Sequence, residues 1–301
     1  MSDGTGGNAI DRTIRLSNGR MLGYAEFGDP NGIPAFYFHG YPGSRLAGQL
    51  HAEDAERAGV RLISPDRPGM GLSDFQPGRR ILDWPNDVGE LADELGIERF
   101  AVLGASGGGP YALACAYAIP QRLTLCGVIA GMTPMEYALS AENVKRSNLA
   151  IFRMSRRPTW LVHLVLWLGI GRFAGNEQKM RKAMRAMLRE LPPEDRSLIE
   201  DERIGSILWK DTIEVHRNGT LGCAYELKLY GSDWGFQLED IACGNVRLWH
   251  GELDVNLPAD AARKMAKRIP NCNASYYPDE AHLSTMVHRA DEIMAAVRQA
   301  A

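Results

Sequence analysis

Short apolar runs alternate with longer segments of helical periodicity over the first 130 residues. Apolar runs bounded by turn residues are typical of buried strands, and helical segments that stop at Gly or Pro are typical of packed helices. The strands predicted in this way are 33–38, 60–63, 100–103 and 123–129, and the helices are 46–58, 82–95 and 107–118. Strands separated by helices predict a mostly parallel sheet with helices on both faces, which is an α/β fold.

A hairpin is predicted before the first of these strands. Asn18-Gly19 separates two extended runs, 13–16 and 21–24. Asn-Gly between two such runs is the strongest short-range hairpin signal. The sheet is therefore expected to begin with an antiparallel pair.

The alternation stops between Thr133 and Trp234, where helical periodicity dominates. It resumes with predicted strands at 245–249 and 274–277 and predicted helices at 259–269 and 283–299. Both flanking parts are needed to complete one sheet, so we interpret the interruption as an inserted helical cap and not as a second domain. The predicted α/β core is 1–132 with 235–301, and the predicted cap (lid) is 133–234.

Length and composition fit one α/β domain with an insertion. The chain has 301 residues, of which 45% are hydrophobic, an ordinary share for a globular protein. The formal net charge is −3, from 34 basic and 37 acidic residues. Without a basic excess to neutralise phosphates, nucleic acid is not an expected partner.

The five cysteines are scattered and lack C-x-x-C spacing, so we expect reduced thiols and no zinc site. The polar, Gly-rich first ten residues have no secretory pattern, which favours a cytoplasmic protein. The most apolar stretch, 160–170, is about half the length of roughly 20 residues that spans a bilayer, so no stable membrane insertion is expected. We interpret it as a buried or half-buried helix, with contact to a membrane surface as the alternative. The basic stretch 177–189 is interpreted as a solvated helix face.

Gly104-Ala105-Ser106-Gly107-Gly108 matches the pattern G-x-S-x-G. It follows a predicted strand and opens a predicted helix, which is the setting that this nucleophile turn requires. Gly104 and Gly108 are expected to avoid clashes across a sharp turn, and Gly107 to present its backbone N–H beside Ser106. An ordinary Gly-rich turn with Ser106 as a helix cap is the alternative.

These residues, with His39-Gly40-Tyr41-Pro42-Gly43 before them and Asp279-Glu280-Ala281-His282 after them, resemble the α/β-hydrolase superfamily, in its serine-nucleophile, esterase- and lipase-like branch. The resemblance implies Ser106 as nucleophile, His282 as base and Asp254 as the acid that orients the base, in the chain order of that family. It also implies the backbone N–H of Tyr41 as an oxyanion-hole donor beside that of Gly107.

Other residues compete for some of these roles. Glu252 and Asp279 are nearby acids, and some members of the superfamily carry the acid after the strand equivalent to 125–129. His39 is expected to brace its loop, and Asp66 and Arg67 to serve loop structure. His163 is expected to be a satisfied histidine in the cap.

The predicted function is hydrolysis of a carboxylic ester or related acyl compound through an acyl-serine intermediate. The apolar residues of 161–168 are expected to wall a pocket for a small apolar or amphiphilic substrate. The alternatives are a C–C bond hydrolase, a lactonase or an aminopeptidase with the same triad, and a lyase, synthase or small-molecule-binding member of the superfamily. No cofactor is expected, since neither a metal cluster nor a dinucleotide fingerprint is evident.

Overall fold

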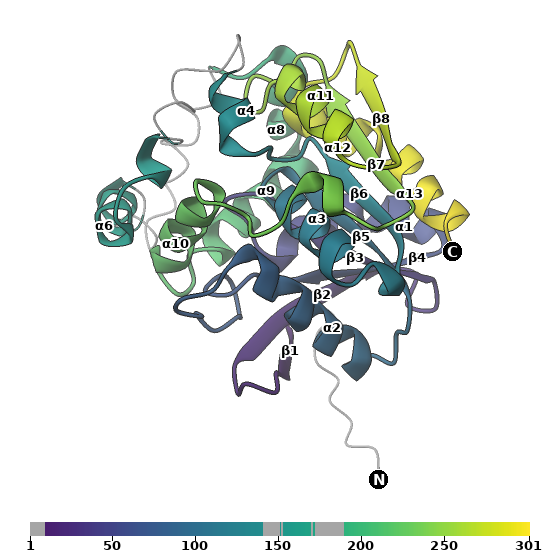
Figure 1. Ribbon diagram of the computed structural model, residues 1–301, viewed down its shortest axis with the longest axis horizontal. Helices are drawn as coiled ribbons and strands as arrows, with labels where there is room; N and C mark the ends of the chain where they lie inside the picture. The colour runs from purple at the N-terminus through teal and green to yellow at the C-terminus, as the bar shows by residue number, and fades with distance from the viewer. Residues whose placement is uncertain (1–9, 141–150, 152, 170, 172–189) are drawn as a thin grey trace.

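The computed structural model of the protein describes residues 10–140, 151, 153–169, 171 and 190–301. The described residues form one eight-stranded sheet in the order β1-β2-β4-β3-β5-β6-β7-β8, with helices around it (Figure 1). The strands are β1 (Arg12–Arg15), β2 (Met21–Gly28), β3 (Ile33–Phe38), β4 (Val60–Pro65), β5 (Phe100–Ala105), β6 (Leu123–Ile129), β7 (Val246–Gly251) and β8 (Cys272–Tyr277). This is the predicted α/β architecture.

The sheet is antiparallel at one edge and parallel elsewhere. β1 and β2 form the predicted hairpin, with Arg15 opposite Met21, and β2 also runs antiparallel to β4. All pairs from β4 through β3 to β8 are parallel.

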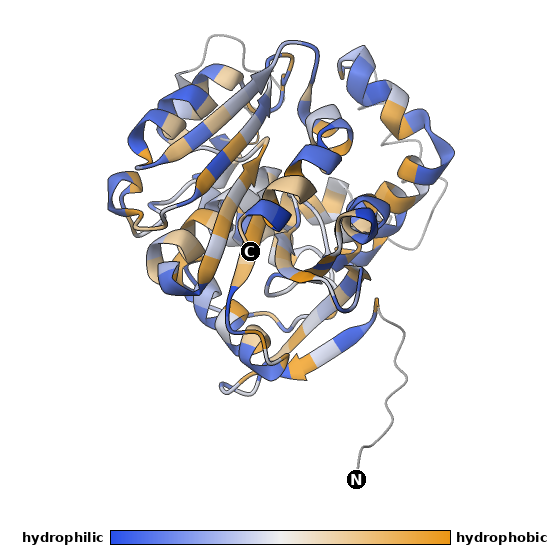
Figure 2. Cartoon of the chain, turned by 90° about the vertical axis from the view of Figure 1, so that its right-hand side faces the viewer, coloured by the Kyte–Doolittle hydropathy of each residue, from blue (hydrophilic) through white to orange (hydrophobic). Residues whose placement is uncertain are grey.

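Side chains of the strands alternate between two apolar layers. In β3, Phe36 and Phe38 point to one layer, whereas Ala35 and Tyr37 point to the other. Helices cover both faces (Figure 2). One face carries α1 (Ala52–Ala58) and α13 (Ala290–Gln299), and the other carries α2 (Trp84–Glu94), α3 (Gly109–Ala118) and α11 (Ala259–Arg268).

The strand order reverses at β3. From β3 the chain continues to β4 on one side and then returns to β5 on the other side, so that Phe38 lies beside Gly104. Open α/β sheets bind ligands outside the carboxyl ends of strands at such a switch point. The loop after β3 (residues 39–44, the β3 loop) and Ser106 after β5 both begin there.

β6 and β7 are neighbours in the sheet, and residues 133–234, called the inserted segment below, lie between them in the sequence. Its described helices are α4 (Met135–Leu139), α6 (Thr159–Gly169), α8 (Pro193–Glu200), α9 (Glu202–Glu214) and α10 (Leu221–Tyr230). α6 packs on α10 at one side of the molecule (Figure 1). The predicted helix face at 177–189 lies outside the described residues.

Two predicted helices are each divided in two. The first half of 46–58 is a 3-10 helix, Arg45–His51, followed by α1. The predicted helix 283–299 consists of α12 (His282–His288) and α13, with the break at Arg289. α12 packs against β7 and α8, whereas α13 packs against α1 and the sheet, so the break lets each half reach its own partner.

Candidate active site

Ser106 occupies a strained turn between β5 and α3. Its φ is +49°, a left-handed conformation that non-glycine residues rarely adopt. A Cβ atom at Gly104 would lie 2.4 Å from the Gly108 carbonyl oxygen, as the prediction of a clash across the turn requires. For Gly108 the reason differs from the prediction, because its Cβ would meet the Phe38 carbonyl oxygen of β3 at 2.1 Å. The neighbouring strand, and not the turn, excludes a side chain there.

The structure brings Ser106, His282 and Asp254 into one hydrogen-bonded chain. Ser106 Oγ lies 3.0 Å from His282 Nε2, and His282 Nδ1 lies 2.7 Å from Asp254 Oδ2. Ser106 follows β5, Asp254 follows β7, and His282 follows β8 as the first residue of α12. Three strand ends of one sheet therefore position residues that are 176 and 28 positions apart in sequence.

Asp254 is buried and bound on both carboxylate oxygens. Its Oδ1 accepts the backbone N–H groups of Asn256 and Leu257, at 2.8 and 2.9 Å. Burial by itself would raise the pKa of Asp254, but the His282 charge and the hydrogen bond from His282 outweigh burial and lower this pKa. The carboxylate is thus held ionised and oriented toward His282 Nδ1.

The His282 ring is polarised by acids. Burial would lower the pKa of its imidazole, but Asp254 first and then Asp195 of α8 raise it above its ordinary value. With Nδ1–H donating to Asp254, Nε2 is left to accept the Ser106 hydroxyl proton. This is the tautomer that proton transfer from Ser106 needs.

The other acids weighed from the sequence lie elsewhere. Glu252 forms an ion pair with Arg263, and Asp279 is exposed and lies 3.3 Å from Arg289. Residues 130–134, which follow β6, include no acid. Among these candidates, Asp254 is the one in contact with His282.

Tyr41 and Gly107 lie side by side next to Ser106. A Cβ atom at Gly107 would be only 2.8 Å from Tyr41 Cβ and 2.5 Å from Tyr230 Oη, so only glycine fits there. Gly40 also lies close to the turn, since a Cβ atom there would be 3.3 Å from Ser106 Cβ. The β3 loop therefore runs directly over the nucleophile turn, where two backbone N–H groups could converge on one oxygen.

The β3 loop is braced from beneath, as predicted for His39 and Arg67. His39 Nδ1 lies 2.9 Å from the Gly40 carbonyl oxygen, and the Arg67 guanidinium donates to the carbonyl oxygens of His39 and Gly40 at 2.5 and 2.9 Å. Burial and then the Arg67 charge lower the pKa of His39 well below its usual value, so this ring is neutral.

Glu226 of α10 anchors this brace and was not predicted. The fully buried carboxylate forms ion pairs with Arg67, at 2.6 Å, and with Arg79. Burial opposes ionisation, yet the two arginines lower the pKa of Glu226 to about 2. Tyr230, one turn later, places its hydroxyl 2.7 Å from Glu226 and 2.9 Å from the Gly107 carbonyl oxygen. An acid of the inserted segment therefore supports both parts of the predicted oxyanion hole.

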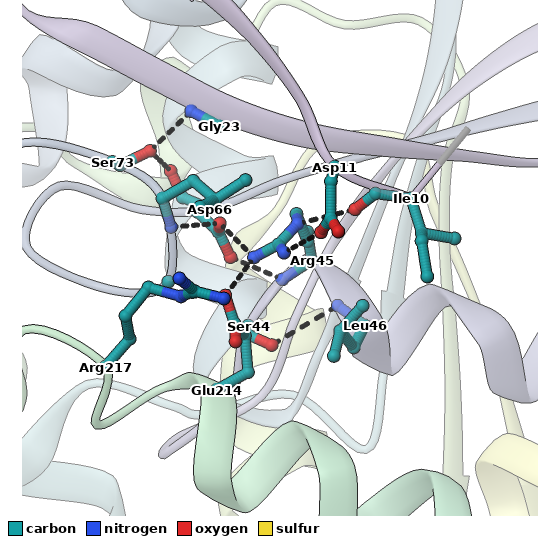
Figure 3. Close-up of polar contacts among 12 residues, drawn as sticks. Ile10, Asp11, Gly23, Ser44, Arg45, Leu46, Asp66, Ser73, Glu214 and Arg217 are labelled. Atoms are coloured by element: carbon teal, nitrogen blue, oxygen red, sulfur yellow. Dashed lines mark hydrogen bonds and ion pairs between the residues drawn. The ribbon is translucent and has the colours of Figure 1, made fainter. Parts of the chain in front are cut away.

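Two further acids of α9 hold the end of the β3 loop. Asp211 Oδ1 accepts the backbone N–H and the hydroxyl of Ser44, at 2.7 and 2.6 Å. Arg45, also buried, lies between Asp66, at 3.0 Å, and Glu214 of α9, at 2.6 Å (Figure 3). Asp66 thus serves loop structure, as predicted.

The pKa of Asp211 contrasts with that of Glu226. Burial first, and then the nearby Asp66 charge, raise the pKa of Asp211 to about 7, although the hydrogen bonds from Ser44 oppose this rise. Among the residues that the structure describes, no arginine forms an ion pair with the Asp211 carboxylate. No sequence motif marks either acid.

The prediction for the apolar stretch 161–168 is only partly correct. Val162 is buried and Leu166 half-buried, packed toward Tyr41 and α10. His163 is half-buried, with Nδ1 3.1 Å from the Thr220 hydroxyl, as expected of a satisfied histidine. The outward face of α6 carries large exposed apolar side chains: Trp160, Leu164, Val165, Trp167 and Leu168. Contact with α10 covers only one face of α6, so these five side chains are exposed, unlike Val162 and Leu166.

A cavity of about 350 Å³ lies where α4 meets the chain after α10. Its lining includes Met135, Arg156, Trp234, Phe236 and Arg268, and does not include Ser106 or His282. Among the residues that the structure describes, no group of three or more His, Cys, Asp or Glu side chains is placed to hold a metal ion. The helices described in the structure include none long and apolar enough to cross a membrane.

The model of the alpha/beta hydrolase family matches residues 35–296, from β3 to within α13. The chain therefore belongs to the alpha/beta hydrolase family.

Individual relatives are more distant. A non-heme chloroperoxidase from Streptomyces lividans is 30% identical over 133 residues, covering 41% of this chain and 45% of that protein. A homoserine O-succinyltransferase from Litchfieldella anticariensis is 42% identical over 93 residues, 31% of this chain and 23% of that one. The chain thus spans less than half the length of these curated relatives. An esterase from Exiguobacterium antarcticum has a similar structure, with a TM-score of 0.67 at 15% identity, over 96% of this chain and 98% of the esterase chain. At this identity the likeness concerns the fold.

Proposed function

We propose that the protein is a serine hydrolase that cleaves a carboxylic ester or related acyl compound through an acyl-Ser106 intermediate. The proposal rests on two linked hydrogen bonds. Ser106 Oγ lies 3.0 Å from His282 Nε2, and His282 Nδ1 lies 2.7 Å from Asp254 Oδ2. A serine hydroxyl is a poor nucleophile without a base within hydrogen-bond reach, and this geometry provides one.

The first half of the reaction acylates Ser106. Ser106 Oγ attacks the substrate carbonyl carbon while its proton passes to His282 Nε2, and Asp254 stabilises the resulting imidazolium. The tetrahedral oxyanion accepts hydrogen bonds from the backbone N–H groups of Tyr41 and Gly107, each worth about 3 kcal/mol in comparable sites. Collapse of this intermediate breaks the bond to the leaving alkoxide, which takes the proton from His282.

The second half releases the acid. Water attacks the acyl-enzyme carbonyl carbon, and His282 Nε2 accepts one proton from that water. The second tetrahedral intermediate collapses with cleavage of the Ser106 ester bond, and His282 returns the proton to Ser106 Oγ. The site is thereby restored with one water consumed.

The substrate is proposed to be small and apolar or amphiphilic, held beneath the inserted segment acting as a cap. Tyr41, Val162 and Leu166 contribute to apolar clusters at the side of Ser106 where the β3 loop runs. We also propose a cytoplasmic location, which the five free thiols support because such thiols persist in a reducing compartment.

The deciding experiment measures hydrolysis of p-nitrophenyl esters from acetate to decanoate by the wild type and Ser106→Ala. We expect the wild type to hydrolyse at least one ester and Ser106→Ala to hydrolyse none. The acyl length that the wild type prefers indicates the size of the substrate pocket. If the wild type hydrolyses no ester while a fluorophosphonate still labels its Ser106, the proposal of ester hydrolysis is wrong. Cleavage of a C–C bond or a lactone, or a receptor-like role, then becomes the favoured function.

His282→Ala tests the assigned base in the same assay. We expect a folded protein that has lost most turnover, because no other base lies within reach of Ser106 in the hydrogen bonds described. Circular dichroism verifies folding. Near-normal turnover by the folded variant would exclude His282 as the base.

A further inference from the structure

Asp195 links the inserted segment to His282. It lies on α8 and is 1% exposed, and its Oδ1 accepts the backbone N–H groups of Leu283 and Ser284, both at 2.9 Å. These are the two residues that follow His282 in the first turn of α12. The N–H groups of a first helical turn have no partner within the helix, so Asp195 supplies one from another element.

The apolar contacts around Asp195 keep it there. Leu198, one turn further along α8, packs in one cluster with Leu283 and Val287 of α12. A hydrogen-bonded carboxylate and an apolar contact thus join α8 and α12 at two points. The backbone that carries the His282 ring cannot shift without breaking both.

The charge of Asp195 acts on His282. Within the described part of the chain, Asp195 forms no ion pair with Lys or Arg. The charged groups that act on its carboxylate are His282 and Asp254. Burial raises the pKa of Asp195, and the Ser284 N–H and His282 counteract that rise. Asp195 thus lies at the backbone that carries His282, and a positive charge on His282 acts on its carboxylate.

We propose that Asp195 is a positioning residue that fixes His282 and holds a second carboxylate, beside Asp254, against its imidazolium. The inference rests on the proposed function, in which His282 becomes positively charged. Asp195 acts through His282 and does not touch Ser106 in the proposed reaction.

The charged groups around His282 determine whether its pKa rises or falls when Asp195 is replaced. Asp254 faces Nδ1, Asp195 lies at the α12 backbone, and His250 of β7 lies 3.5 Å from Asp254 Oδ2 through its Nε2. Of these, the two acids raise the pKa of His282. Removing the Asp195 charge therefore lowers the pKa of His282, and turnover persists to lower pH.

Two substitutions separate charge from hydrogen bonding. Asp195→Asn keeps an oxygen that can accept both N–H groups but removes the charge, and Asp195→Ala removes both. For Asp195→Asn we expect the acidic limb of the kcat profile to move to lower pH and the plateau to stay within about threefold of wild type. For Asp195→Ala we expect the same movement of the limb with a loss of about tenfold in kcat and little change in KM, because the base is displaced.

Asp201→Asn is the matched control. Asp201 caps α9 by accepting the Ile204 N–H at 2.9 Å, but it is exposed and does not bind α12. Its pH profile should superimpose on that of the wild type. A helix cap of purely structural importance would make Asp195→Asn behave like this control.

The titration of the His282 ring, followed by NMR on protein with labelled histidine, decides the inference without any turnover. The His282 signal is assigned by its loss in His282→Gln. A lower midpoint in Asp195→Asn supports the proposal, and an unchanged midpoint overturns it, even if Asp195→Ala fails to fold. Absence of ester turnover in the wild type would instead count against the proposed function alone.

Discussion

The sheet core and the inserted segment both contribute to the surroundings of Ser106, but in different ways. The core provides the side chains of the hydrogen-bonded chain, each at the carboxyl end of a strand: Ser106, Asp254 and His282. The inserted segment provides buried acids that bind α12, the end of the β3 loop and the arginines beside that loop: Asp195, Asp211 and Glu226. The hydrogen bonds between neighbouring strands position Ser106, Asp254 and His282, whereas side-chain contacts of the inserted segment position the segments around them.

The two groups of residues should therefore respond differently to substitution. A change in the core group should alter the reaction while leaving the fold intact. A change in the acids of the inserted segment should act through stability, loop position or pH dependence. The inserted segment is therefore part of the framework that holds the β3 loop and α12 in place.

The largest effect is expected for Asp254→Asn. The amide cannot hold the required tautomer of His282 or stabilise its imidazolium, and in a well-studied triad this change lowers kcat by about 10⁴. The measurement is kcat on the preferred p-nitrophenyl ester, with thermal unfolding as a control for stability. If kcat were unchanged, Asp254 would not be the orienting acid and the comparison between core and inserted segment would lose its basis.

Glu226→Gln should act mainly on stability. Gln leaves Arg67 and Arg79 buried without a countercharge, which costs about 3–5 kcal/mol of unfolding free energy. The expected decrease in Tm at pH 7 is about 10 °C. Glu239→Gln is the matched control, since Glu239 pairs with Arg268 at the surface and should change stability by less than about 1 kcal/mol.

The pH dependence of stability tests the same residue. The folded-state pKa of Glu226 is lowered from 4.5 to about 2, so its contribution is complete above about pH 5 and is lost as the pH falls toward 2. Over this window the wild type should lose about 3 kcal/mol that Glu226→Gln does not lose. Parallel stability curves for the two proteins would show that Glu226 is not ionised in the folded state.

Asp211→Asn should have the opposite sign. The folded-state pKa of Asp211 is raised from 3.8 to about 7, so the wild type loses stability as the pH rises from about 4 to about 7, and this loss is complete above pH 7. Asn keeps an oxygen for the two hydrogen bonds from Ser44. This rise in pKa corresponds to about 4 kcal/mol, so we expect Tm to increase by about 10 °C at pH 8, with the gain shrinking as the pH falls toward 4. A Tm decrease of the same size at every pH would contradict this explanation.

Most of the sheet could be predicted from the sequence. The hairpin at Asn18-Gly19 and the strands from 33–38 onward follow from turn residues and apolar runs, and the structure has them. The break at Arg289 could not be predicted, because no Gly or Pro marks it. It arises from packing of α12 and α13 on different partners, which is a property of the tertiary structure.

The residues of the candidate site also fall into those that the sequence predicts and those that it does not. Ser106, His282 and Asp254 stand in a motif or in a family order, so a local pattern could identify them. Asp195 and Glu226 bind backbone N–H groups and arginines that are 88 and 159 positions away in sequence. Nothing near these acids in the chain distinguishes them from surface carboxylates, and only the fold shows that they are buried.

The smallest effects should distinguish the two faces of α6. Val162 is fully buried against α10, whereas Leu164, two positions later, is 43% exposed. Val162→Ala removes two buried methyl groups and should cost about 2 kcal/mol, because the transfer and cavity terms add. Leu164→Ala should change stability by less than about 0.5 kcal/mol. Urea unfolding of the two variants measures both values, and equal losses would mean that the outward face of α6 is covered in solution.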